Sequence, residues 1–243
     1  MKTRLCRRAG LVLFLFVTAA SPAVAQTPLL TCLSDDAGTP LDRRIDDCTK
    51  VIDAGGLAPV RLAIAFQNRA TAFLDKGEGD RAIQDYDRAI ALNPRYANAF
   101  NGRGVAYQAK GDNERALQDY SEAIRLDPAN ANALNGRCWL RAALGQLQPA
   151  LADCDESLRL RPDNSNTLDS RGFVNLRLGR WDDALADAEA ALKANPQNAW
   201  ALFERGIAKR RKGDAIAGDT DIGASRRLDP SAEMEFASLG LRP

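Results

Sequence analysis

The chain contains 243 residues, of which 33 are Lys or Arg and 32 are Asp or Glu, and it contains no histidine. This nearly balanced charge argues against bulk attraction to nucleic acid or to an anionic membrane surface. Without histidine, the chain lacks the usual acid–base group near neutral pH and the commonest metal ligand.

Residues 1–25 have the layout of a secretory signal peptide. Four basic residues precede an apolar run over residues 11–20, and Ala23-Val24-Ala25 then forms a small-residue cleavage site. The run is shorter than the roughly 20 residues that span a bilayer, so we expect cleavage after Ala25, with an uncleaved anchor as the alternative. The mature chain would carry 29 basic and 32 acidic residues and would be periplasmic or secreted, without stable membrane insertion. The basic start leaves both the Sec and the twin-arginine export routes open.

Residues 26–62 are expected to form an N-terminal capping segment. An irregular start is followed by one orphan helix over residues 42–53, and a Gly- and Pro-containing loop over residues 54–59 leads onward. Such a cap would shield the end that a stack of repeats otherwise exposes to water.

From residue 63 onward the sequence repeats itself every 34 residues. Glycine recurs five times at one position of the repeat and proline five times at another, at Gly77, Gly111, Gly145, Gly179 and Gly213 and at Pro94, Pro128, Pro162, Pro196 and Pro230. A period of roughly 20–50 residues is typical of a solenoid, in which each unit buries its apolar face by stacking on its neighbours. We expect five units, over residues 63–96, 97–130, 131–164, 165–198 and 199–230.

Each unit is predicted to be a helix–turn–helix. In the second unit, an amphipathic run over residues 98–110 ends at Gly111, where a residue in left-handed conformation would stop the helix. Asp112 is placed to cap a second helix over residues 113–126, and Pro128 forces the chain out of helical conformation. Small residues recur where the two helices would cross, at Ala70, Gly104, Cys138, Gly172 and Gly206 and at Ala82, Ala116, Ala150, Ala184 and Gly218.

The repeat resembles the tetratricopeptide repeat family, here of an exported bacterial type. The residues that carry the resemblance are Phe100, Gly104, Tyr107, Ala116, Tyr120 and Pro128, and it extends over residues 63–230. The resemblance implies an all-α, right-handed superhelical solenoid of helix–turn–helix repeats. It also implies that the first helix of each unit lines a concave face that binds a protein or peptide.

An arginine replaces the family's usual leucine in every unit, and an aspartate recurs with it. These residues are Arg69, Arg103, Arg137, Arg171 and Arg205 and Asp85, Asp119, Asp153, Asp187 and Asp221. We interpret them as a ladder of partly buried ion pairs that sets the register of the helices, with ligand binding as the alternative.

Four cysteines follow the signal peptide, an even number that is typical of a disulfide framework in an exported protein. Cys138 occupies the small-residue position of a first helix and Cys154 lies opposite it on the second helix, at about the same height and close enough for a bridge. Cys48 aligns with Cys154, and Cys32 again lies 16 residues before it. We expect the disulfides Cys32–Cys48 and Cys138–Cys154, with reduced core cysteines as the alternative.

The concave face implied by the resemblance would present two surfaces to a partner. The N-terminal half carries asparagines, at Asn98, Asn101, Asn132 and Asn135, and Asn166 and Asp169 continue the same two rows. The C-terminal half carries an aromatic patch rimmed by arginine, at Trp139, Phe173, Arg177, Trp200, Phe203 and Arg210. The alternatives are a solvated polar face for the asparagines and packing against a C-terminal cap, over residues 231–243, for the aromatic patch.

The chain lacks a catalytic triad, a phosphate-binding loop, a nucleophile elbow and a metal-ligand cluster. We therefore predict no catalytic, cofactor-binding or metal site, and a non-catalytic scaffold or adaptor that binds a protein or peptide. The alternatives are a self-assembling structural subunit of an envelope complex and an accessory domain of an envelope enzyme. The sequence leaves the identity of the partner and the oligomeric state open.

Overall fold

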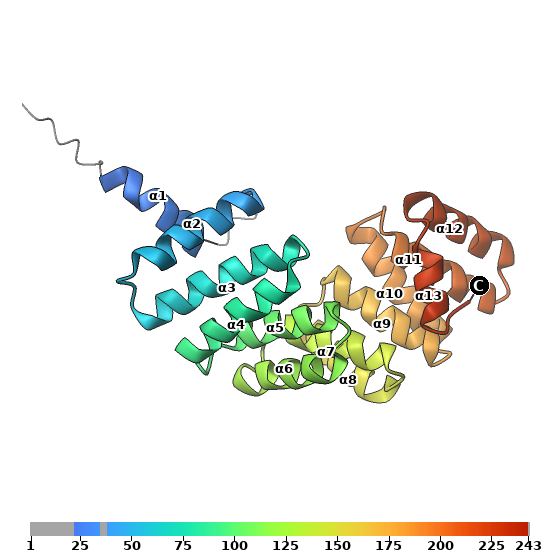
Figure 1. Cartoon of the computed structure of the whole chain (residues 1–243). Coiled ribbons are helices and arrows are strands. Elements are labelled where there is room, and N and C mark those ends of the chain that lie inside the picture. The colour runs from blue at the N-terminus through green and yellow to red at the C-terminus, as the bar shows by residue number, and fades with distance from the viewer. Residues whose placement is uncertain (1–21, 35–37, 243) are drawn as a thin grey trace, which may run out of the picture.

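Figure 1 shows the computed structural model of the chain, which describes residues 22–34 and 38–242. Within these ranges the regular elements are all α-helices: α1 (Pro22–Leu33), α2 (Leu41–Ala54), α3 (Pro59–Asp75), α4 (Gly79–Leu92), α5 (Ala97–Ala109), α6 (Asn113–Leu126), α7 (Ala131–Ala143), α8 (Leu147–Leu160), α9 (Ser165–Arg177), α10 (Trp181–Ala194), α11 (Ala199–Arg211), α12 (Ala215–Leu228) and α13 (Ala232–Ser238). None of the helices described combines the length and the apolar character needed to cross a membrane. The signal peptide expected over residues 1–25 lies outside the described residues as far as residue 21.

The helices stack in pairs along the chain, as the sequence predicts. Helix α3 packs on α4, α5 on α6, and so on to α12, and each second helix also contacts the first helix of the next pair. Successive first helices touch one another, whereas successive second helices have no contact in the described part of the chain. The stack therefore curves, with α3, α5, α7, α9 and α11 on its inner side (Figure 1).

The turn inside each pair uses the chemistry that the sequence predicts. Gly111 has a φ of 78°, a left-handed conformation that costs glycine little, and the other four turn glycines are also left-handed. The Asp112 side chain then accepts a hydrogen bond from the backbone N–H of Arg115 at 3.1 Å and so caps α6. The same local signals therefore end one helix and begin the next.

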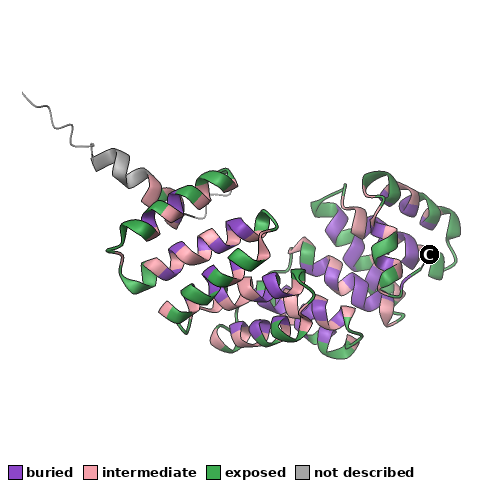
Figure 2. Ribbon diagram, viewed as in Figure 1, coloured by how far each residue is buried: buried purple, intermediate pink, exposed green. Residues whose placement is uncertain are grey.

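Small residues close the pairs tightly. Ala116 is fully buried, and the ring of Tyr120 packs over Gly104 of its own pair and Gly136 of the next. A Cβ atom at Gly136 would lie 2.7 Å from the Tyr120 ring, so only glycine leaves room for it. Buried positions accordingly lie along the facing sides of the helices, and the outer turns are exposed (Figure 2).

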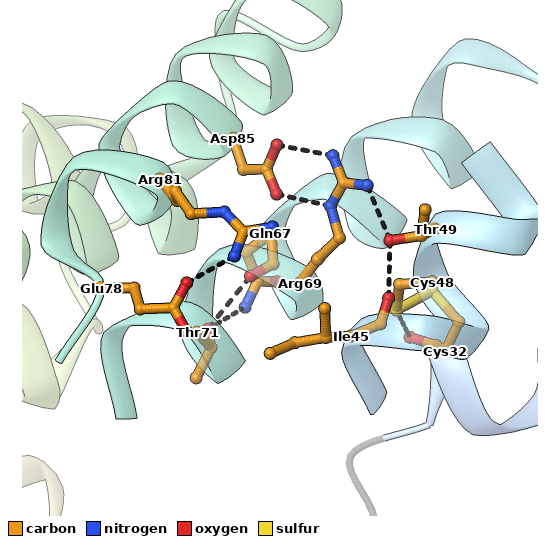
Figure 3. Close-up of polar contacts among 10 residues, drawn as sticks. All are labelled: Cys32, Ile45, Cys48, Thr49, Gln67, Arg69, Thr71, Glu78, Arg81 and Asp85. Atoms are coloured by element: carbon orange, nitrogen blue, oxygen red, sulfur yellow. Dashed lines mark hydrogen bonds and ion pairs between the residues drawn. A yellow bond between two sulfur atoms is a disulfide. The ribbon is translucent and has the colours of Figure 1, made fainter. Parts of the chain in front are cut away.

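All five expected arginine–aspartate pairs are present. Figure 3 shows the first, in which Arg69 donates from Nε and Nη2 to the two carboxylate oxygens of Asp85, at 2.7 and 2.9 Å. The other four pairs join the same repeat positions. This two-pronged geometry satisfies both oxygens of a nearly buried carboxylate, which confirms a structural role for the ladder.

The same arginines also connect neighbouring pairs. The Nη1 atom of Arg69 donates to Thr49 of α2 at 3.0 Å (Figure 3), and that of Arg137 donates to Ser121 of α6 at 3.2 Å. Arg171 reaches Asp155 of α8 at 2.9 Å in the same way. Each of these guanidinium groups therefore fixes both the angle within a pair and the position of the preceding pair.

The N-terminal segment differs from the irregular start and orphan helix that we expected. Helix α1 occupies Pro22–Leu33 and packs against both α2 and α3, so α2 has a partner. Pro28 lies inside α1, and because proline removes a backbone donor, the sequence there did not suggest a helix. Leu29 and Leu33 stabilise the arrangement by packing on the buried cluster around Cys48.

Both expected disulfides are present, and each lies inside one helix pair. Cys32–Cys48 joins α1 to α2 with a Cα–Cα distance of 4.7 Å (Figure 3), and Cys138–Cys154 joins α7 to α8 with a Cα–Cα distance of 5.4 Å. Structural disulfides of this kind are typical of proteins in an oxidising compartment.

Candidate functional site

A groove of about 340 Å³ lies on the inner side of the stack, across α5, α7, α9 and α11. Its lining combines apolar surface with a few polar groups, as ligand sites commonly do. The lining residues are Val105, Gln108, Tyr120, Asn135, Gly136, Trp139, Asn166, Asp169, Ser170 and Trp200. The expected partner-binding residues Asn135, Trp139 and Trp200 therefore line one groove, together with Asn166 and Asp169, which continue the two polar rows.

Two tryptophans form the apolar part of the groove. The rings of Trp139 and Trp200 meet edge to face, with 5.4 Å between their centroids and 73° between their planes. Both side chains are half-buried, so each holds the other in place while part of its surface faces the groove. Val105 occupies the same repeat position as Trp139, so the period of the sequence could have placed Val105 on the same face.

Three polar side chains of this inner face each have one oxygen without a hydrogen-bond donor in the described part of the chain. One side-chain oxygen each of Asn101, Asn135 and Asp169 is buried and has no hydrogen-bond partner among the residues that the structure describes. These three residues occupy the same repeat position on α5, α7 and α9. Buried acceptors are normally satisfied by protein groups or by ordered water, so each of these oxygens can still accept a hydrogen bond from a donor outside the described residues.

Asp169 is the acidic member of that row. Its Oδ2 accepts a hydrogen bond from Asn198 at 2.7 Å, and no Lys or Arg among the described residues forms an ion pair with it. Burial raises the pKa of Asp169 to about 6, and the bond from Asn198 only partly opposes this effect. A partly desolvated carboxylate without a cation is therefore present beside the tryptophans.

Behind the groove, Glu204 of α11 is completely buried, and neither carboxyl oxygen has a hydrogen-bond partner in the described ranges. Its carboxyl group packs against Gly172 of α9, in the space that the Tyr120 ring fills over Gly104. Burial, together with the charges of Asp169 and Asp187, raises the pKa of Glu204 well above its usual value. The neutral acid is therefore favoured, and this group was not expected from the sequence.

The other half of the expected aromatic patch is not available to a partner. Phe173 and Phe203 are both 0% exposed, because Phe236 of α13 stacks on Phe203 with 4.6 Å between ring centroids. Arg177 donates from Nη1 to the carbonyl oxygen of Leu239 at 2.6 Å. Phe173 and Phe203 therefore pack under the C-terminal cap, which is the alternative stated for this patch, and Arg177 binds the residue that follows α13.

The remaining expected residues lie outside the groove. Asn98 accepts a hydrogen bond from Asn130 at 3.2 Å, and the exposed Asn132 accepts one from Arg161 at 3.2 Å. Arg210 is also exposed and pairs with Asp219 of α12 at 2.5 Å. Their partners are thus nearby side chains of the chain itself.

Comparisons with known proteins agree with the fold of stacked helix pairs. Two family models described as tetratricopeptide repeat match residues 97–130 and 174–215, and a third, described as TPR repeat, matches residues 70–111. No curated protein matches the chain significantly.

Solved structures share the fold at low sequence identity. YrrB, described as a TPR protein with an unusual peptide-binding site, is 22% identical over 80% of this chain and 98% of its own, with a TM-score of 0.58. MamA from Desulfovibrio magneticus RS-1 is 16% identical over 70% of this chain and 96% of its own, with a TM-score of 0.59. A tetratricopeptide repeat protein from Parabacteroides merdae is 16% identical over 82% of this chain and 81% of its own, with a TM-score of 0.62. Sequence period, stacked helix pairs and the matches of the family models agree, and the chain therefore contains tetratricopeptide repeats.

Proposed function

We propose that this protein is an exported, non-catalytic scaffold or adaptor that binds a protein or peptide on the concave face of its solenoid. The observation that carries the proposal is the inner groove, where Trp139 and Trp200 lie beside unpaired acceptors of Asn135 and Asp169. An extended peptide offers both apolar side chains for the indole surface and backbone N–H groups for the acceptors.

Similarity of fold adds modest support. YrrB is described as having a peptide-binding site, and this chain shares its stacked helix pairs. Fold alone does not establish function, so the proposal depends on the chemistry of the groove.

Export is the second part of the proposal. It is supported by the order of basic, apolar and small residues in the first 25 positions and by the two disulfides. Mass spectrometry of the protein made in its native host should find a mature chain that begins at Gln26 outside the cytoplasm. A full-length chain retained in the cytoplasm would contradict this part and leave the binding proposal standing.

Site-specific photocrosslinking in the native envelope tests the binding proposal. A photoreactive amino acid at Asn135 should crosslink to a partner polypeptide, and the same amino acid at the exposed Glu114 of α6 should not. Replacing Trp139 by Ala should weaken the crosslink from position 135, because the partner loses the indole surface.

Two results would contradict the proposal. Equal crosslinking from positions 135 and 114 would mean that the groove has no special role. Crosslinks solely to a second copy of the chain, with light scattering giving a multiple of the monomer mass, would favour the self-assembling subunit.

A further inference from the structure

The carboxylate of Asp169 in the groove has no ion-pair partner in the described part of the molecule. Asp169 is partly buried, one of its oxygens has no partner, and the salt bridges of the described residues do not include it. By contrast, each aspartate of the ladder, such as Asp187, faces a guanidinium group. A carboxylate with so little compensation costs stability, and a cation from outside the chain would remove that cost.

The surroundings of Asp169 suit one class of cation. Trp139 and Trp200 line the same groove, and indole faces attract ammonium and guanidinium groups. The apolar stem of a long basic side chain would pack on the same rings. The unpaired oxygen of Asn135 offers a further acceptor, which an ammonium or guanidinium group can satisfy because it carries several donors.

We propose that the groove recognises a basic side chain, a lysine or arginine, of the partner peptide. Its charged end binds Asp169 and the oxygen of Asn135, and its stem lies on Trp139 and Trp200. This inference rests on the proposed function, since it assigns a side-chain preference to the same peptide-binding groove.

The charge state of the groove follows from the same arrangement. A bound cation favours the ionised form of Asp169, whose pKa is about 6 because of burial, so binding should strengthen as the pH rises through 6. The neighbouring acid groups are Glu204 of α11, whose pKa is raised by burial and by the charge of Asp169, and Asp187 of α10, which is paired with Arg171. Burial favours the neutral form of Glu204, so it adds little competing charge.

Selection from a displayed library of random peptides tests the inference on the mature protein with its disulfides intact. The wild type should enrich peptides with Lys or Arg at one position. The Asp169→Asn variant should lose that preference while keeping the preferences at other positions. The matched control is Asp163→Asn, which changes an exposed aspartate just before α9 and should behave as the wild type does.

A synthetic peptide from the selection gives the magnitude without relying on any variant. Replacing its basic residue by norleucine, which keeps the stem and removes the charge, should weaken binding to the wild type about tenfold or more in fluorescence anisotropy. The basic peptide should bind more tightly at pH 7 than at pH 5, whereas the norleucine peptide should show no such gain.

The outcomes separate the two proposals. Selected peptides without a basic preference, or a preference that persists in Asp169→Asn, would overturn the inference and leave peptide binding intact. Failure of the wild type to select any peptide would overturn both.

Discussion

Replacing Glu204 by Gln should change how the stability of the protein depends on pH. Glu204 is completely buried beside Gly172, its carboxyl oxygens have no partner in the described chain, and burial raises its pKa well above the usual value. Glutamine has nearly the same size and shape but does not ionise, so the substitution isolates the effect of the proton.

The size of the effect follows from proton linkage. In the unfolded chain the carboxyl ionises near its ordinary pKa of about 4.3, whereas the folded chain keeps the proton to a higher pH. Between these two pKa values the folded state binds one proton more than the unfolded state. The free energy of unfolding should therefore fall by about 1.4 kcal/mol for each pH unit of rise in this interval, and this contribution is fully present only below the unfolded pKa.

Denaturant titrations at several pH values between 5 and 8, with the disulfides oxidised, measure this contribution. The free energy of unfolding of Glu204→Gln, relative to the wild type, should increase steadily with pH. Glu114→Gln is the matched control, because Glu114 is an exposed side chain on α6, and its difference from the wild type should stay constant. A constant difference for Glu204→Gln as well would refute the reasoning that this carboxyl is held neutral.

Three further predictions concern stability, each measured by denaturant unfolding. Arg69→Leu should lower the free energy of unfolding by about 3–5 kcal/mol, because it leaves the buried carboxylate of Asp85 without its partner. Adding Asp85→Leu should recover much of this loss. An equal loss in the single and the double variant would contradict the ladder. Gly136→Ala should cost about 1–3 kcal/mol, because the new methyl group would meet a tyrosine ring at 2.7 Å. The control Gly223→Ala meets only the end of a flexible arginine at 3.6 Å and should not destabilise, so equal effects would contradict the packing argument. Serine at both cysteines of the α7–α8 disulfide should cost about 3 kcal/mol, and an unchanged midpoint would mean that the bridge contributes nothing.

The repeating features of the fold could be predicted from the sequence because each has a local or pairwise cause. Gly111 ends a helix through its own backbone conformation, and Asp112 caps the next through its own side chain. Arg69 and Asp85 both recur with the period of the repeat, so their pairing could be predicted from the sequence. The two disulfides followed from the same register.

The ends of the stack were harder to predict because they depend on contacts between segments that do not repeat. Pro28 obscured α1, and packing of the aromatic patch on a C-terminal cap was an alternative that the repeat pattern could not decide, because Phe236 lies outside the repeats. As a result, part of the expected binding surface became the interface with the C-terminal cap. The groove was predicted in part. Trp139 and Trp200 were expected on this face, but Tyr120 lines the same groove because of how the stack curves, which the sequence does not specify.

Glu204 marks a departure from the repeat that a closer comparison of the units could have detected. Tyr86 packs on Gly102 and Tyr120 packs on Gly136, each ring filling the space left by a glycine. The corresponding positions later in the chain hold Ala188 and Glu204, so the large and small partners are exchanged. At this point of the stack a carboxyl group replaces a tyrosine ring.

The placement of the two disulfides has a mechanical consequence. Each bridge closes a loop with a sequence separation of 16 within a single pair, and neither joins one repeat to another. If the molecule were pulled from its two ends, neither disulfide would hold one helix pair to the next. Each disulfide loop would keep roughly 50 Å of chain from extending. While the disulfides stay intact, the segments between Cys32 and Cys48 and between Cys138 and Cys154 should therefore add little to the length of the stretched chain.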